Sequence, residues 1–205
     1  MQANEHYTEA RKLATSIRAK YGLTTARVMV TDLRKIYKQE GIKQFEYWDK
    51  FSVRIKGAYF NDEHGTTVVI SKRLITQIEP KVFTMAHELK HHLADNVSGV
   101  SFCSDDNEKV LVERAADAFA SELIYPVNLL IQDLQSRRIE KGEGTANDIV
   151  CLKHETRTTL SHSALALKVA RLGYCDASIL KTRWHMLRNE LYPEYTRYRK
   201  ASSVF

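Results

Sequence analysis

Cysteine is scarce in this chain, and long apolar runs are absent. The three cysteines are odd in number, widely spaced and without a Cys-x-x-Cys pair: Cys103, Cys151 and Cys175. This pattern argues against a disulfide framework and against a cysteine zinc site. No stretch approaches the about 18 apolar residues of a membrane helix, and no apolar segment near the N-terminus precedes a small-residue cleavage site. We therefore expect a cytoplasmic protein with no membrane contact.

Two histidines and a glutamate stand together in the sequence His87-Glu88-Leu89-Lys90-His91. On a helix, His87 and His91 differ by about 40° around the axis, so both can reach one ion. Glu88 points about 100° away, which suits a base that holds water better than it suits a metal ligand. This is the HExxH pattern of zinc peptidases, and a catalytic site of this kind needs a third protein ligand.

The third ligand is predicted on a later helix. Residues 112–124 favour a helix, and two of their carboxylates, Glu113 and Asp117, share one face with alanines. If that face is buried, the two like charges repel each other, and a cation would resolve the conflict. We predict Zn²⁺ held by His87, His91 and Glu113, with Asp117 accepting the outer N–H of one histidine. The alternative is a solvated acidic patch on an ordinary helix.

Several segments together resemble the ImmA/IrrE family of metallopeptidases, with the Glu-x-x-x-Asp variant of the zinc site found in thermolysin-like enzymes. The similar segments are Lys56–Phe60, Val68–Ile70, Phe83–Leu89, Glu113–Pro126 and Leu160–Tyr174. The resemblance covers about residues 5–175, and its specific part is 83–126. Two departures bear on the shape of the substrate cleft: Lys90 stands where the family usually has glycine, and Tyr125 replaces the usual methionine.

The resemblance implies a fold and an activity. The fold is α+β, a mostly helical zincin-like domain with a small antiparallel sheet and flanking helices. The activity is that of a zinc endopeptidase that cleaves a helix-turn-helix transcriptional repressor encoded by a phage, a mobile element or a toxin–antitoxin pair, and so relieves repression. In that chemistry zinc activates a water molecule and polarises the scissile carbonyl, while Glu88 takes the water's proton and passes it to the leaving nitrogen.

The rest of the chain supports one domain with three regions. Of the 205 residues, 43% are hydrophobic and 27% are charged, as in ordinary globular proteins. We predict a single domain over residues 1–205, with N-terminal helices (1–44), a sheet and the zinc-site helices (45–130), and a C-terminal helical region (131–205). The alternating run 51–55 and the β-branched run 66–70 predict an antiparallel pair, whose second strand offers an edge to an extended substrate.

The net charge of +6 gathers toward the two ends of the chain. It permits contact with nucleic acid or an acidic partner, although a solvated basic surface is the plainer interpretation. Residues 146–173 are spaced like a helix-turn-helix. Their second helix offers mainly Ser163, Lys168 and Arg171 beside a broad apolar face, so we favour packing over DNA reading.

Four other histidines and two other functions complete the predictions. His154 and His162 either lean over the cleft to stabilise an oxyanion or lie on the surface, His92 is structural or exposed, and His64 is solvated in a hairpin turn. A non-catalytic regulator that keeps the zinc fold as a binding platform is an alternative to the enzyme, although the retained Glu88 speaks against it. Direct DNA binding is a third interpretation, which steep salt dependence of affinity would support.

Overall fold

Apolar residues recur at helical spacing in the first part of the chain, and two helices form there. The computed structural model describes residues 2–49, 55–95 and 106–194. Within it, α1 (Gln2–Tyr21) buries Ala10, Ala14 and Ile17, and α2 (Val30–Gln39) buries its apolar face. The two helices predicted near the N-terminus are therefore present.

A three-stranded sheet follows: β1 (Gln44–Trp48), β2 (Gly57–Asp62) and β3 (Gly65–Ser71). The strand order is β1-β3-β2, so β3 lies in the middle. Its three consecutive β-branched residues, Val68 to Ile70, are fully buried. A continuous run of apolar residues is typical of a strand buried on both faces, and β3 is the central strand of this sheet.

The sheet is mixed, which corrects the predicted antiparallel sheet. The hairpin of β2 and β3 is antiparallel as expected, but β1 pairs with β3 in parallel. The chain crosses from β1 to the opposite edge, runs back as β2, and then enters the middle as β3. Of the predicted strand 51–55, residues 51–54 lie outside the described residues, and Ile55 is not in a strand. Because β3 is central, the free edge predicted for it belongs instead to β2.

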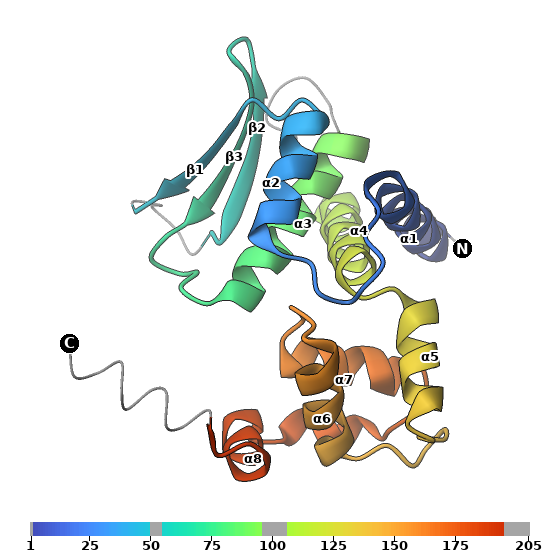
Figure 1. Ribbon diagram of the computed structural model, residues 1–205. Coiled ribbons are helices and arrows are strands. Elements are labelled where there is room, and N and C mark those ends of the chain that lie inside the picture. Colours follow the sequence, from blue (N-terminus) through green and yellow to red (C-terminus); the bar gives the residue numbers. More distant parts are fainter. Residues whose placement is uncertain (1, 50–54, 96–105, 195–205) are drawn as a thin grey trace, which may run out of the picture.

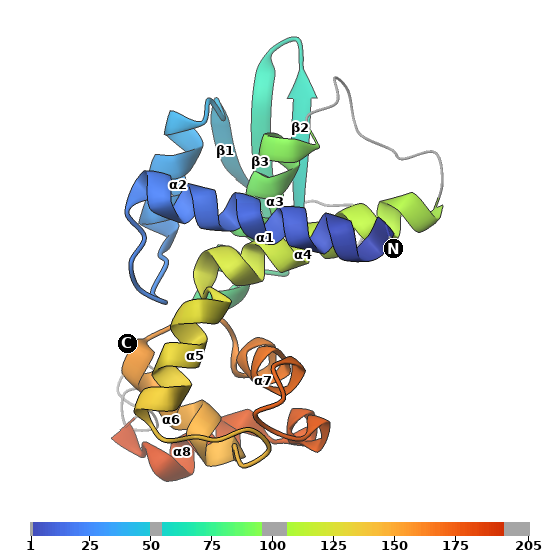
Figure 2. The same cartoon turned by 90° about the vertical axis from the view of Figure 1, so that its right-hand side faces the viewer.

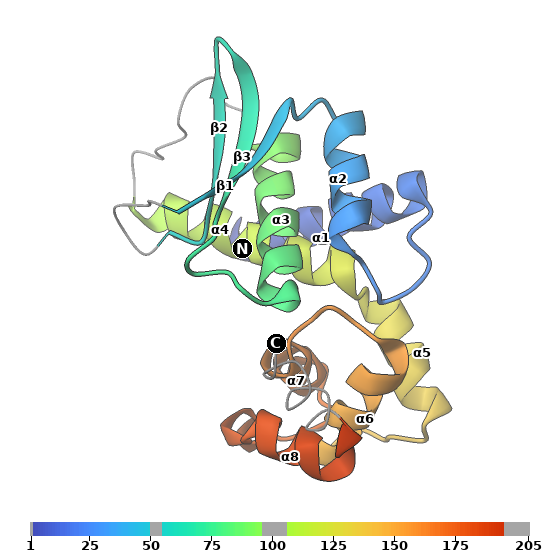
Figure 3. The same ribbon diagram turned by 60° about the vertical axis from the view of Figure 1, so that its left-hand side comes forward.

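The helices that carry the motif residues lie on one side of this sheet. Helix α3 (Ile78–Ala94) packs against β2, β3 and α2, and α4 (Asp106–Ile124) packs against α3. Helix α1 packs on the side of α4 that faces away from the sheet, and in Figure 2 it lies in front of α4. The order of layers is therefore sheet, then α2 with α3, then α4 with α1 (Figures 1 and 3).

The chain continues into a helical group beyond the end of α4, drawn in yellow to red in Figure 1. Its elements are α5 (Val127–Ser136), α6 (Ala146–Thr156), α7 (His162–Arg171), η1 (Ala177–Lys181) and α8 (Trp184–Leu191). One cluster of buried apolar side chains extends from Ala10 to Ile179 and joins this group to the sheet and its helices. The division into one domain with three regions stays a prediction.

Residues 146–173 form the two helices that the helix-turn-helix spacing indicated. Ser161 accepts a hydrogen bond from the backbone N–H of Ala164 at 3.2 Å and so caps α7. Leu165 and Val169 are buried, which agrees with a packing role. Lys168, one of the side chains that a DNA-reading helix would use, is buried as well.

The C-terminal end of α4 is held by two buried cations from other helices. Arg18 of α1 donates to the carbonyl oxygen of Leu123 at 2.6 Å, and Lys168 of α7 donates to the carboxylate of Glu122 at 2.9 Å and to the carbonyl of Tyr125. Helix C-termini carry unpaired carbonyl groups and a partial negative charge, which cations satisfy. These contacts fix the helix on which Glu113 lies.

Among the residues that the structure describes, no helix has both the length and the apolar character needed to span a membrane.

Candidate metal centre

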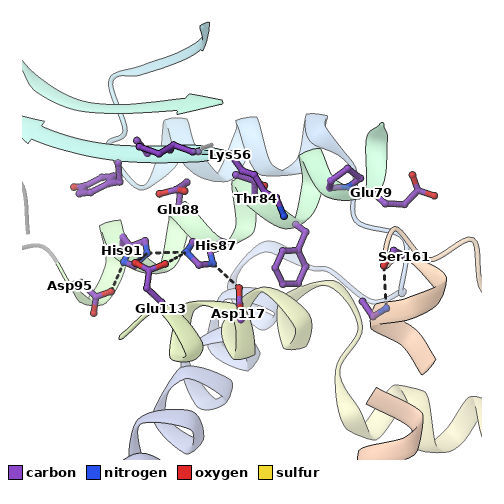
Figure 4. Close-up of a pocket in the computed structure, with 17 residues that line it drawn as sticks. Lys56, Glu79, Thr84, His87, Glu88, His91, Asp95, Glu113, Asp117 and Ser161 are labelled. Carbon is purple, nitrogen blue, oxygen red and sulfur yellow. Dashed lines mark hydrogen bonds and ion pairs between the residues drawn. The ribbon is translucent and has the colours of Figure 1, made fainter. Parts of the chain in front are cut away.

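The two histidines of the motif lie side by side on α3 and point toward α4 (Figure 4). Their Nε2 atoms are 3.2 Å apart. From α4, Glu113 brings its carboxylate to 3.2 Å from Nε2 of His87 and 3.7 Å from Nε2 of His91. One ligand atom of each of these three residues lies within 4.8 Å of the other two, so the group can hold a metal ion. Two imidazole nitrogens and a carboxylate oxygen form a donor set typical of catalytic zinc.

Asp117 lies one turn after Glu113 and contacts the same histidine from its other side. Its Oδ1 is 3.0 Å from Nδ1 of His87, which leaves Nε2 of that ring facing Glu113. Burial opposes protonation of His87, but the hydrogen bonds to Asp117 and Glu113 raise the pKa of its imidazole to about 10. In the metal-free protein His87 therefore holds a proton between two carboxylates, and a metal cation would replace that proton.

Asp95 orients the second histidine, a role that sequence reasoning missed. Its Oδ2 lies 2.8 Å from Nδ1 of His91, and its two oxygens accept hydrogen bonds from the buried ammonium of Lys90 at 2.6 and 2.7 Å. Burial works against ionisation, but the hydrogen bonds from His91 and Lys90 hold the pKa of Asp95 below its usual value. The signal was local, because a carboxylate four residues after a helical histidine shares its face. Lys90 therefore holds Asp95 beside His91.

Glu88 is buried beneath the start of β2. Burial raises the pKa of its carboxyl, while the neighbouring imidazoles of His87 and His91 partly oppose that rise. The backbone of Gly57 passes so close that a Cβ atom placed there would lie 2.7 Å from a carboxylate oxygen of Glu88. Glycine at this position thus lets β2 cover the carboxylate.

These residues line a cleft of about 680 Å³ between α3, α4 and the β2 edge. Its walls include Lys56 from the β2 side and Asp117 from α4 (Figure 4), and Tyr59 of β2 lines it as well. Within the part of the chain that the structure describes, β2 pairs on one side alone, with β3. An unpaired strand edge beside a concave site is suited to an extended peptide, which can add as a further strand.

Glu113 and Asp117 do not lie on a buried face of α4, so the condition under which their like charges alone would require a cation is not met. Their side chains are 52% and 60% exposed, because this face of α4 borders the open cleft, while neighbouring Ala116 is fully buried. The carboxylates are nevertheless brought to the two imidazoles. Their position results from the crossing of α3 and α4, which the alanine spacing alone does not specify.

The other histidines lie away from the metal cleft. His92 donates from Nε2 to the carbonyl oxygen of Glu40 at 2.8 Å, and its Nδ1 lies 3.0 Å from the hydroxyl of Tyr59, so its role is structural. His64 is exposed in the hairpin turn, as predicted. His154 and His162 do not line the metal cleft and instead line a second cavity, so the idea that either stabilises an oxyanion there is wrong.

Comparison with known families decides the relationship. The sequence model of one family, peptidase family M78, described as the IrrE N-terminal-like domain, matches residues 49–156. This is more than half of the 205-residue chain. The chain belongs to this family. The resemblance to ImmA/IrrE peptidases seen in the sequence is thereby confirmed. A comparison with curated proteins found no match.

The part that matches the M78 peptidase family contains the whole candidate centre. It begins before β2 and ends with α6, and so includes α3 and α4 with every side chain at the metal group. Helices α7 and α8 lie outside the match. Membership supports a peptidase-like function for this chain.

Proposed function

We propose that this M78 family member is a zinc-dependent endopeptidase. The observation that carries the proposal is the convergence of His87, His91 and Glu113 beside a buried glutamate in an open cleft. When bound there, zinc would supply the Lewis acidity that activates a water molecule and polarises a peptide carbonyl. The donor set and the open side of the group fit a catalytic ion better than a structural one, which is usually enclosed by four protein ligands.

Glu88 is the general base in this proposal. Its carboxylate lies on the cleft wall near both imidazoles, and burial raises its pKa toward the range in which a carboxylate both accepts and returns a proton. It accepts a proton from the attacking water and delivers it to the leaving nitrogen. The peptide lies extended along β2, with backbone hydrogen bonds holding its scissile bond above α3.

The proposed substrate is a helix-turn-helix repressor, cut in the cytoplasm so that repression is relieved. Support for this class comes from the family relationship. The basic surface of the chain, with a net charge of +6, offers an electrostatic attraction to an acidic face of such a partner.

The test compares wild type with Glu88→Gln and a matched control, Glu143→Gln, whose residue is exposed in a loop. Each protein is loaded with zinc and incubated with the repressor encoded beside its gene, and the products are identified by mass spectrometry. We expect Glu88→Gln to keep zinc and partner binding while cleavage falls at least about 100-fold, because the amide cannot accept a proton. The control should cleave like wild type.

Cleavage by Glu88→Gln at near the wild-type rate would falsify the assigned mechanism. Binding of the repressor by wild type with no cleavage at all would favour the non-catalytic platform. Binding of operator DNA that weakens steeply with salt would favour direct DNA contact.

A further inference from the structure

A second cavity, of about 330 Å³, lies beyond the end of the metal cleft. Residues far apart in the sequence line it, from the segment before α2 to α8. Six of its lining residues are basic: Arg27, Lys153, His154, Arg157, His162 and Arg188. Glu79, which also lines the metal cleft and is visible at its end opposite Asp95 in Figure 4, is the one carboxylate among the lining residues.

Lys153 already neutralises that carboxylate. Its ammonium donates to the carbonyl oxygens of Thr158 at 2.9 Å and Leu160 at 2.6 Å, and lies 3.4 Å from Glu79. These contacts use its donors, so Lys153 ties α6 to the first turn of α3. Among the lining residues, Arg27 and Arg157 then have no further carboxylate beside them on the cavity wall.

Arg27 and Arg157 have side chains that can turn to a ligand. Both residues are exposed, and within the described ranges no hydrogen bond or ion pair is found for either guanidinium. Arg157 ends α6 in the left-handed conformation, with φ of 52°. Arginine recognises phosphate with paired N–H donors, which makes two such side chains lining one cavity suitable for holding an anion.

His162 adds an uncharged hydrogen-bond donor to the cavity, and the pKa of its imidazole reflects the positive charges nearby. Its ring stacks on Trp184, with ring centres 5.8 Å apart. Burial, together with the charges of Lys153 and Arg188, lowers the pKa of its imidazole to about 4. At neutral pH the imidazole is uncharged and retains one N–H to donate.

We propose that this cavity binds a small phosphorylated molecule of nucleotide size. Its phosphate is held by Arg27 and Arg157, and its remaining part rests on the apolar side chains of Met29, Ile78 and Val150, which also line the cavity. The volume is at the lower end of the range usual for small-molecule sites, which excludes a folded macromolecule from the interior. The site is separate from the proposed peptidase chemistry, and its occupancy is measured without cleavage.

The test is calorimetric binding of ADP and of inorganic pyrophosphate at physiological salt. The pocket variant is Arg27→Gln/Arg157→Asn, and the matched control is Arg171→Gln/Arg138→Asn. Arg138 is exposed and left-handed like Arg157, with φ of 56°, and Arg171 is exposed, but neither lines the cavity. Asparagine tolerates the left-handed conformation, and both double variants remove two positive charges.

We expect the control to bind each probe with the same affinity as wild type. The pocket variant should have an affinity at least about 10-fold lower, since each charge-assisted hydrogen bond contributes roughly that factor. Adenosine should bind weakly to all three. Equal weakening in both double variants would overturn the proposal in favour of a general basic surface. The proposal would also be overturned if neither ADP nor pyrophosphate bound to wild type. Binding of an acidic peptide to wild type, with no binding of ADP or pyrophosphate, would overturn it as well. Thermal unfolding of each variant checks that it is folded.

Discussion

At the scale of single residues, each motif histidine is positioned by its own carboxylate, and the two carboxylates differ. Asp117 is exposed on the cleft wall and contacts His87. Asp95 is largely buried and is held by Lys90 beside His91. Removing Asp95 would leave a buried ammonium without its partner, so a change there affects stability as well as metal binding. Asp117 is therefore the better residue for testing orientation alone.

Asp117→Ala should weaken zinc affinity by roughly 10- to 100-fold without unfolding the chain, because the imidazole of His87 loses the acceptor that fixes its tautomer and ring angle. Chelator competition measures the affinity. Asp49→Ala is the control, since that aspartate forms an exposed ion pair with Lys72. Zinc retention equal to that of wild type would make Asp117 a solvated surface charge.

His162 predicts a pH effect on stability. Its folded-state pKa of about 4 lies below its ordinary value of 6.5. The unfolded chain therefore binds this proton more readily, so stability is complete above about pH 6.5 and falls as the pH drops toward 4. The loss is on the order of 1 kcal/mol once solvent screening is allowed for.

His162→Gln should remove that part of the acid destabilisation, so its unfolding free energy should fall less than that of wild type between pH 6.5 and pH 4.5. Denaturant unfolding at several pH values measures the difference. His64→Gln, at an exposed histidine, should follow wild type. Parallel pH curves for His162→Gln and wild type would contradict the prediction.

At the scale of elements, the site depends on how β2 and α4 are held against α3. β2 can lie over Glu88 because Gly57 has no side chain there. α4 brings Glu113 and Asp117 to the imidazoles while its C-terminal end is fixed by Arg18 and Lys168. The contacts at the end of α4 lie far along the helix from the metal group, so they can be tested through stability.

Lys168→Met should destabilise the chain by about 3–5 kcal/mol, because Glu122 would remain buried without its cation and the carbonyl of Tyr125 without its donor. Burial lowers the pKa of the Lys168 ammonium, although Glu122 partly opposes that effect. Urea unfolding measures the loss. Lys181→Met, at an exposed lysine in η1, is the control.

The double variant Glu122→Gln/Lys168→Met should recover part of the stability, since the buried charge is gone. A loss below about 1 kcal/mol for Lys168→Met would mean that water replaces the ammonium at the end of α4.

At the scale of the whole molecule, the core is built without the metal group. The buried apolar cluster from Ala10 to Ile179 joins the elements on both sides of α3, while the side chains of the three proposed metal ligands are partly exposed at the cleft. Metal should therefore stabilise a fold that already exists, in contrast to small zinc domains that unfold without it. The stabilisation follows mass action and grows with free zinc concentration.

Chelation should lower the melting temperature while the helical circular dichroism at 25 °C stays unchanged. Elemental analysis of wild type should give about one zinc per chain, and His91→Ala should lose both the zinc and the zinc-dependent rise in melting temperature. His64→Ala should behave like wild type. Equal zinc in His91→Ala and wild type would refute the site, and unfolding on chelation would show that the metal is structural.

Much of this protein could be predicted from local sequence patterns. The HExxH spacing places His87 and His91 on one face of α3, and the helical spacing of Glu113 and Asp117 places both on one face of α4. The packing of α7 followed from its apolar face. These predictions worked because residues three or four apart on a helix share a face wherever that helix lies.

Tertiary structure decided what lies across from each of these faces. The largely exposed β1 pairs in parallel with β3, and no local pattern specifies which strand is its partner. The backbone of β2 at Gly57 lies directly over the carboxylate of Glu88, and residues from Arg27 to Arg188 line the basic cavity. Such pairings depend on long-range packing of the apolar core. The sequence by itself determined the faces and the residue types of the candidate site, and the packing of the elements determined which faces meet, because contacts between distant segments form only once the core is buried.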